Sequence, residues 1–215
     1  IRNTNVTAGE SGGITQHISA YQVKKKGQII TFVDTPGHEA FSAMRERGVS
    51  IADIAILVVA ADDSVKPQTK EVIAYLLEKK LPVIVAINKI DKPGTNLQRV
   101  KQELGENGIL VEDWGGQVLC SEVSAKNKIG IDELLDNVLL LMEVENFVAD
   151  YKREALGIVL ESHLDPQKGP VSTVLVKTGT LKEGQDIIVG AAFGRVRRME
   201  DFAGKRLAEA GPSVP

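Results

Sequence analysis

The chain has 215 residues, of which 43% are hydrophobic and 26% are charged, ordinary shares for a globular protein with a sizeable core. Its net charge of −3 excludes an overall basic field for nucleic acid, so any RNA partner would be met through local patches. The single cysteine, Cys120, excludes an internal disulfide and suits a reducing cytoplasm, and no apolar run approaches the roughly 18–20 residues that span a membrane.

The first third of the chain predicts a loop, a hairpin, a helix and a buried strand. Residues 1–18 are polar and glycine-rich, which is typical of a loop. Strands are expected at 20–24 and 28–33, on either side of a Lys-Lys-Gly turn. A helix is expected over 39–47, and the continuous apolar run 54–61 is typical of a parallel strand that is covered on both faces.

The middle of the chain continues this alternation of strand and helix. Helices are expected at 67–80, 97–107 and 131–147, the last with an apolar face of Leu134, Leu135, Val138 and Leu141, and strands at 82–87 and 118–123. Alternating elements of this kind predict an α/β fold with a doubly wound, mostly parallel sheet and right-handed crossovers.

The pattern changes after Asp150. Short β-rich segments follow at 157–160, 171–176 and 186–189, with glycines between them, as in a small antiparallel β-barrel. We therefore expect two domains. The first, residues 1–150, would be a partial α/β domain, and the second, residues 151–215, the N-terminal part of a β-barrel.

Two strand ends in the first domain carry polar residues that suit a guanine base. The motif Asn-Lys-Ile-Asp at 88–91 follows one strand, and Ser-Ala-Lys at 124–126 follows the next. Open α/β sheets bind ligands at the carboxyl ends of their strands. Guanine presents N1–H and N2–H₂ as adjacent donors, and the Asp91 carboxylate would accept both. The first motif alone could be a polar turn, but the second one strand later favours base recognition.

The other residues of these two motifs have complementary roles in this interpretation. Asn88 would bond the base edge and tie the neighbouring loops together. The aliphatic stem of Lys89 and the side chain of Lys126 would cover the two faces of the ring. Ser124 opens the second loop, and the backbone N–H of Ala125 would reach guanine O6. A site built this way rejects bases that leave its polar groups unpaired.

A third strand end, Asp-Thr-Pro-Gly-His at 34–38, suits the phosphates. Asp34 would hold Mg²⁺, through a bound water, and Thr15 would offer a hydroxyl ligand to the same ion. The Gly37 N–H would bond the γ-phosphate, and both contacts would be lost when that phosphate leaves, which is an order–disorder switch. His38 would orient the attacking water; a lone histidine is more often structural, but its place directly after Asp-x-x-Gly favours catalysis.

A family resemblance covers essentially the whole chain. The residues that carry it are Gly-Glu-Ser-Gly-Gly-Ile-Thr-Gln-His-Ile at 9–18, Asp-Thr-Pro-Gly-His-Glu-Ala-Phe at 34–41, Ala-Ala-Asp-Asp at 60–63 with Pro-Gln-Thr at 67–69, Asn-Lys-Ile-Asp-Lys-Pro at 88–93 and Ser-Ala-Lys at 124–126. The chain resembles the translational GTPases, and among them the bacterial translation initiation factors.

This resemblance implies a GTP-binding domain followed by a β-barrel, with GTP, GDP and Mg²⁺ as ligands. It implies GTP hydrolysis that the large ribosomal subunit stimulates, with His38 at the position of the family's catalytic histidine. It also implies a cytoplasmic protein that contacts both ribosomal subunits, promotes their joining and binds initiator tRNA through C-terminal modules beyond this chain. No membrane partner is implied.

One motif of that family is missing from the chain. A loop of the form Gly-x-x-x-x-Gly-Lys-Ser/Thr occurs nowhere in the sequence, and the family places it just before residues that resemble the start of this chain. We therefore expect a chain truncated at both ends, with negligible GTP turnover by residues 1–215 alone. The missing strand would lie between the strands that end at Asp34 and Ala61, so exposed edges and apolar surface are expected there.

Three other functions remain compatible with the sequence. The chain could come from an elongation or selenocysteine-specific factor, or from the GTPase subunit of sulfate adenylyltransferase, which resembles translational GTPases. It could also be a non-catalytic module that only docks on the ribosome. Association with ribosomes rather than with a sulfurylase partner would separate the second of these from the translation factors.

Overall fold

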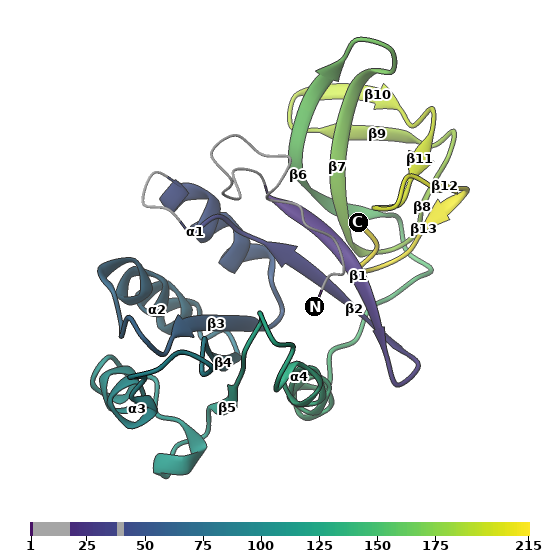
Figure 1. Cartoon of the computed structure of the whole chain (residues 1–215). Helices are drawn as coiled ribbons and strands as arrows, with labels where there is room; N and C mark the ends of the chain where they lie inside the picture. Colours follow the sequence, from purple (N-terminus) through teal and green to yellow (C-terminus); the bar gives the residue numbers. More distant parts are fainter. Residues whose placement is uncertain (2–17, 38–40) are drawn as a thin grey trace. The chain divides into compact units, whose positions relative to one another are not determined.

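The computed structural model describes residue 1, residues 18–37 and residues 41–215 (Figure 1). These residues divide into two compact units. One contains Ile1 and Pro36–Phe147, and the other contains the N-terminal hairpin together with Val148–Pro215.

The first unit is built on a three-stranded parallel sheet in the order β3-β4-β5. Its strands are β3 (Ala55–Ala60), β4 (Val83–Asn88) and β5 (Leu119–Glu122). In their register Ala60 lies beside Asn88, and β4 pairs with β5 as far as Ile87 and Glu122. All three strands therefore end at the same edge, where the loops that follow them lie close together.

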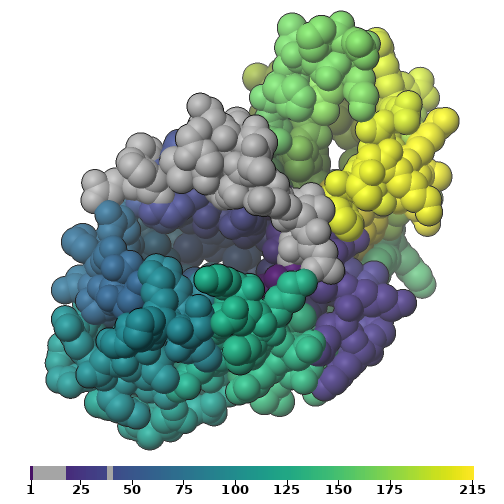
Figure 2. All heavy atoms as spheres, viewed as in Figure 1, coloured from purple at the N-terminus to yellow at the C-terminus, as the bar shows by residue number. Residues whose placement is uncertain are grey.

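Four α-helices and one 3₁₀-helix accompany this sheet in the described part of the chain, and the predicted alternation of strand and helix is confirmed. They are α1 (Ser42–Ile51), α2 (Pro67–Lys79), α3 (Leu97–Glu106), η4 (Glu112–Trp114) and α4 (Ile131–Glu145). Helices α2 and α3 cover one face of the sheet and α4 the other (Figure 1). In the space-filling view the blue-to-teal part of the chain, which contains α2 and α3, forms one continuous surface (Figure 2). Among the described residues, no helix is both long and apolar enough to cross a bilayer.

The core of this unit is centred on β4, whose residues Ile84, Val85, Ala86 and Ile87 are at most 1% exposed. Alternate residues of a strand point to opposite faces, so a strand covered by helices on both sides is apolar throughout, as expected. On α4 the buried residues are Leu134, Leu135, Val138 and Leu139. Leu141, which we predicted on this apolar face, is only half-buried, because burial declines toward the helix end, where Val144 is exposed, and Leu139 is buried in addition.

A buried lysine fastens α3 to β5. Lys101 is 5% exposed, and its Nζ lies 2.9 Å from Glu122 Oε1 and 2.5 Å from Asp113 Oδ2. Burial alone would lower the pKa of Lys101, but the two carboxylates raise it above its usual value. The ammonium is therefore charged, and it joins a helix, a 3₁₀-helix and a strand.

Lys101→Met is expected to loosen this junction. Methionine keeps the apolar stem but leaves two carboxylates close together, at a cost of about 1–2 kcal/mol, since both carboxylates are partly exposed and regain water. Hydrogen exchange in the full-length protein should show amides of α3 and β5 opening roughly tenfold more often. Lys79→Met is the matched control, because Lys79 is exposed and its Nζ lies 3.9 Å from Glu78 Oε1, so its loss removes only a surface ion pair. Equal exchange in the two variants would contradict a stabilising role for Lys101.

The second unit begins with the expected hairpin, β1 (Ser19–Lys25) and β2 (Gln28–Asp34). Its two turn residues, Lys26 and Gly27, both have positive φ angles, 49° and 84°, which is the backbone of a type I′ turn. Within the same unit, Gln22 Nε2 donates to the Ser213 carbonyl at 3.1 Å.

Strands β2 and β3 belong to different sheets, and β3 is an edge strand among the residues that the structure describes. Val58, in the middle of β3, is 59% exposed, which is unusual for an apolar residue in a parallel strand. The expectation of an open edge and exposed apolar surface beside this strand agrees with both observations.

The rest of the second unit is antiparallel, as expected for the barrel-like segment. Its strands are β6 (Leu156–Asp165), β7 (Gly169–Thr178), β8 (Leu181–Lys182), β9 (Asp186–Val189), β10 (Ala192–Arg195), β11 (Met199–Glu200), β12 (Arg206–Leu207) and β13 (Glu209–Ala210). They pair as β6-β7, β9-β10, β11-β12 and β8-β13. Strands β6 and β7 are longer than the sequence predicted, with ten residues each.

Candidate functional site

The loops after β4 and β5 are joined through one side chain, that of Asn88. Its Oδ1 accepts the Lys89 N–H at 2.8 Å and the Ala125 N–H at 3.0 Å. Lys89 has a φ angle of +67°, which is uncommon for a residue other than glycine. The side chain of Asn88 thus holds a strained turn and ties it to the neighbouring loop.

A second link connects the same loops through Asp91 and Ser124. The Ser124 hydroxyl donates to Asp91 Oδ1 at 2.5 Å and accepts the Asn127 N–H at 3.1 Å. Ser124 is fully buried, so its orientation is fixed by these partners. The bond from Ser124, with smaller contributions from Lys126 and Lys92, holds the pKa of Asp91 below its usual range. Asp91 is therefore an ionised acceptor, and Lys126 is exposed beside it.

The structure brings together five of the six residues predicted to read the base, through hydrogen bonds among Asn88, Lys89, Asp91, Ser124 and Ala125. One detail differs from the prediction. The N–H of Ala125, expected to reach guanine O6, donates to Asn88 in this structure. To bond O6 as well, this N–H would have to be shared between the two acceptors or the loop would have to shift.

Sequence reasoning missed the contacts of an acidic pair beside this site. Asp62 lies just after β3, and its Oδ1 is 3.2 Å from Lys89 Nζ while its Oδ2 is 2.5 Å from Lys92 Nζ. Asp63 lies 3.6 Å from Lys89 Nζ and 3.0 Å from Lys66 Nζ. The bond from Lys92, followed by that from Lys89, lowers the pKa of Asp62 to about 2. The sequence could have indicated these contacts only through the predicted fold, because parallel pairing of β3 and β4 brings the ends of these strands side by side.

The residues predicted to face the phosphates are only partly within the described chain. Thr15 and His38 lie outside the described residues. Asp34 is exposed at the end of β2, and Gly37 belongs to the other compact unit. A side-chain carbon added at Gly37 would meet no atom within 4 Å, so the described neighbours do not themselves require glycine there.

The described residues contain no group of three or more histidine, cysteine, aspartate or glutamate side chains that would hold a metal ion. Mg²⁺ needs no such group, because it usually binds through one or two carboxylates together with waters and substrate phosphates. A single exposed carboxylate such as that of Asp34 suits this mode of Mg²⁺ binding.

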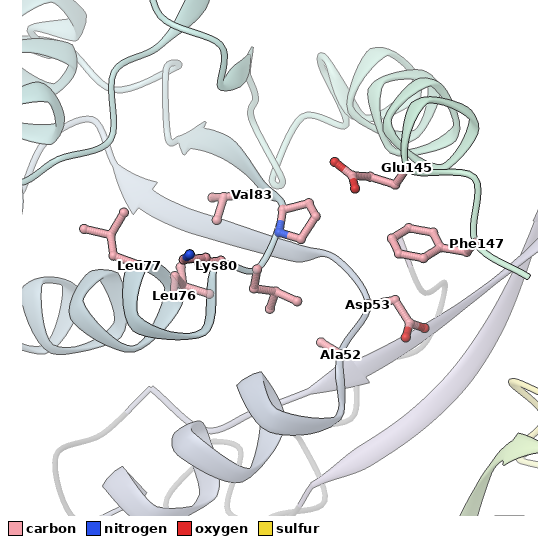
Figure 3. A pocket seen from close by; sticks show the side chains of 10 residues that line it. Ala52, Asp53, Leu76, Leu77, Lys80, Val83, Glu145 and Phe147 are labelled. Carbon is pink, nitrogen blue, oxygen red and sulfur yellow. The ribbon is translucent and has the colours of Figure 1, made fainter.

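A cavity of about 630 Å³ lies at the other edge of the sheet (Figure 3). It is lined at the amino ends of β3 and β4 by Ala52, Asp53, Pro82 and Val83, and by Phe147 beyond α4. None of the residues predicted to bind a nucleotide lines it. The candidate site is instead an open surface formed by loops at the carboxyl edge.

The fold and these loops define a class, an α/β nucleotide-binding domain followed by an antiparallel β domain. Comparison with family models identifies both parts. The model described as "Elongation factor Tu GTP binding domain" matches residues 3–144, and "Elongation factor G domain 2" matches residues 154–215. The chain belongs to the family of elongation factor Tu-type GTP-binding domains.

Within that family the chain is similar to bacterial initiation factors. It is 59% identical over all 215 residues to "Translation initiation factor IF-2" of Pelotomaculum thermopropionicum and 55% identical to the protein of the same name from Clostridium botulinum strain Alaska E43. The chain spans 22% and 31% of the length of these two relatives.

Solved structures give the same fold. The GDP-bound aIF5B from Aeropyrum pernix matches 99% of this chain and 47% of its own, with a TM-score of 0.75 and 28% identity. A bacterial selenocysteine-specific elongation factor, EF-Sec, matches 94% of this chain and 35% of its own with a TM-score of 0.75. At 23% identity, that second likeness concerns the fold alone.

Proposed function

We propose that these residues are part of a GTP-binding translation initiation factor that hydrolyses GTP when the ribosome stimulates it. Two observations support the proposal: the identity with relatives named as initiation factors, and the paired loops at the carboxyl edge of the sheet. The observation that carries the nucleotide assignment is the joined arrangement of Asn88, Asp91 and Ser124.

Base recognition follows from the chemistry of that arrangement. The ionised Asp91 accepts N1–H and N2–H₂ of guanine, and charge on the acceptor strengthens both bonds. Because Asn88 Oδ1 already has two donors, the amide NH₂ group remains as the donor for the base edge. The stems of Lys89 and Lys126 lie over the ring, and the Ala125 N–H is shared with O6.

The phosphate side completes the proposal. Asp34 and Thr15 hold Mg²⁺, which neutralises charge on the phosphate oxygens when bound. The Gly37 N–H bonds the γ-phosphate, and His38 orients the attacking water. The β-phosphate side is expected from a Gly-x-x-x-x-Gly-Lys-Ser/Thr loop that this chain does not contain.

The names of the relatives support a setting in translation initiation. We place the full-length protein in the cytoplasm, on the ribosome, where the large subunit activates hydrolysis. Initiator tRNA is bound by C-terminal domains beyond this chain, and subunit joining accompanies GTP hydrolysis.

Purified ribosomes are expected to raise GTP hydrolysis by the full-length protein by roughly 10²–10⁴-fold, because hydrolysis depends on positioning groups that the ribosome sets in place. Phosphate release is measured with and without ribosomes, with ATP and with each subunit alone as controls. A rate that ribosomes leave unchanged would overturn the proposal, as would equal use of ATP. Cosedimentation with a sulfurylase partner in place of ribosomes would favour the sulfate-assimilation alternative.

A further inference from the structure

Asp91, the carboxylate that we assign to the base, lies close to several lysines. Lys89 and Lys92 flank Asp91 along the chain, and Lys92 and Lys126 are close enough for their charges to act on it. An ammonium bonded to Asp91 would occupy the acceptor that guanine N1–H and N2–H₂ require. The site therefore needs some arrangement that keeps these lysines elsewhere.

Asp62 provides a competing acceptor. Its two oxygens bind two different lysines, Oδ1 with Lys89 at 3.2 Å and Oδ2 with Lys92 at 2.5 Å. The bond from Lys92 is the shorter of the two. The charge of Asp91 acts on the Lys92 ammonium in addition to that of Asp62. In the structure this ammonium bonds Asp62, which lies outside the base site, and the charge of Asp63 also acts on it.

The loop that carries Asp62 is held independently of these lysines. The Val65 N–H donates to Glu103 Oε2 at 2.9 Å, and Arg99 Nε donates to Glu103 Oε1 at 2.8 Å. The Ala61 N–H donates to the Asn88 carbonyl at 2.8 Å, which continues the pairing of β3 and β4. The position of Asp62 is therefore set by the fold, and the flexible lysine side chains adapt to it.

We propose that Asp62 is a positioning residue that draws Lys92 away from Asp91 and so keeps the Asp91 carboxylate open to the guanine base. The inference rests on the proposed function, because it takes Asp91 as the group that reads the base. It adds a residue outside the base-binding loops to the determinants of base selectivity.

The test is a double-mutant cycle in the full-length protein, with GDP and inosine diphosphate as the ligands. Asp62→Asn is expected to weaken GDP binding roughly tenfold, because Lys92 then bonds Asp91. Inosine lacks the 2-amino group, so its nucleotide loses less and the preference for GDP over inosine diphosphate falls. Lys92→Met alone should stay within about twofold of wild type, and adding it to Asp62→Asn should restore most of the GDP affinity and the preference.

Asp63→Asn is the matched control for charge, since the ion pairs of this neighbouring carboxylate are with Lys66 and Lys89. It should change GDP affinity by less than about threefold. GDP binding by Asp62→Asn at the wild-type level would overturn the inference. So would a double variant as weak as Asp62→Asn, since that result assigns Asp62 a merely structural role. Failure of the wild-type protein to bind GDP would overturn the proposed function, and the inference with it.

Discussion

Asp91→Asn is expected to change the base preference of the full-length protein from guanine to xanthine. The substitution replaces one acceptor oxygen with an NH₂ donor, which faces the 2-amino group of guanine unfavourably. Xanthine carries an oxygen at that position, so the same NH₂ group bonds it while the remaining oxygen accepts N1–H. Two charge-assisted bonds are affected, at about 1.5–3 kcal/mol each, so GTP affinity should fall by roughly 10²–10⁴.

Competition between GTP and xanthosine triphosphate for the variant measures this change. Because the amide oxygen that the substitution leaves in place would still accept the Ser124 hydroxyl, the loops should keep their link and the variant should remain folded. Asp63→Asn serves as the control for loss of one negative charge nearby. GTP bound by the Asp91 variant as tightly as by wild type would remove the base-reading assignment.

His38→Ala is expected to lower ribosome-stimulated GTP hydrolysis by roughly 10²–10⁴ while GTP affinity stays within about threefold. An imidazole that orients the attacking water acts in the transition state and contributes little to binding the substrate. The assignment of His38 to catalysis rests on its position in the strand-end motif that begins at Asp34, and on the family resemblance.

His163→Ala is the matched control, because His163 lies on β6 with an exposed side chain. Single-turnover hydrolysis on ribosomes and equilibrium binding of GTP are measured for both variants. Full stimulated hydrolysis by His38→Ala would exclude this histidine from catalysis, and a parallel loss of GTP affinity would assign it to binding.

The first domain was largely predictable because its signals are local and strong. The continuous apolar runs became β3 and β4, and Pro67 begins α2 as expected of proline in a first helical turn. The hairpin turn followed from the Lys-Lys-Gly segment between the two strands, in which Gly27 adopts a positive φ angle without strain. The proximity of the loops after β4 and β5 was predictable because parallel strands end together, so motifs far apart in sequence meet at one edge, and base binding by these loops stays a prediction.

The features that escaped prediction depend on tertiary placement. The two-residue strands β8, β11, β12 and β13 are too short to leave a periodic pattern. The contacts of Asp62 join loops after two different strands, and nothing local in Ala-Ala-Asp-Asp indicates which lysines it meets. The exposure of Val58 reflects the place of β3 at the edge of the described sheet, which no single apolar run reveals.

The double acceptance by Asn88 Oδ1 has a kinetic consequence. Because Asn88 already ties the two loops together, the loops would lose little conformational entropy when a purine binds. They would therefore not need to unfold to release it. The residence times of GDP and GTP on the protein would then differ only because of contacts made by their phosphates. On the proposed function, the base contacts would set the affinity and selectivity for guanine, and the phosphate contacts would set the difference between GTP and GDP.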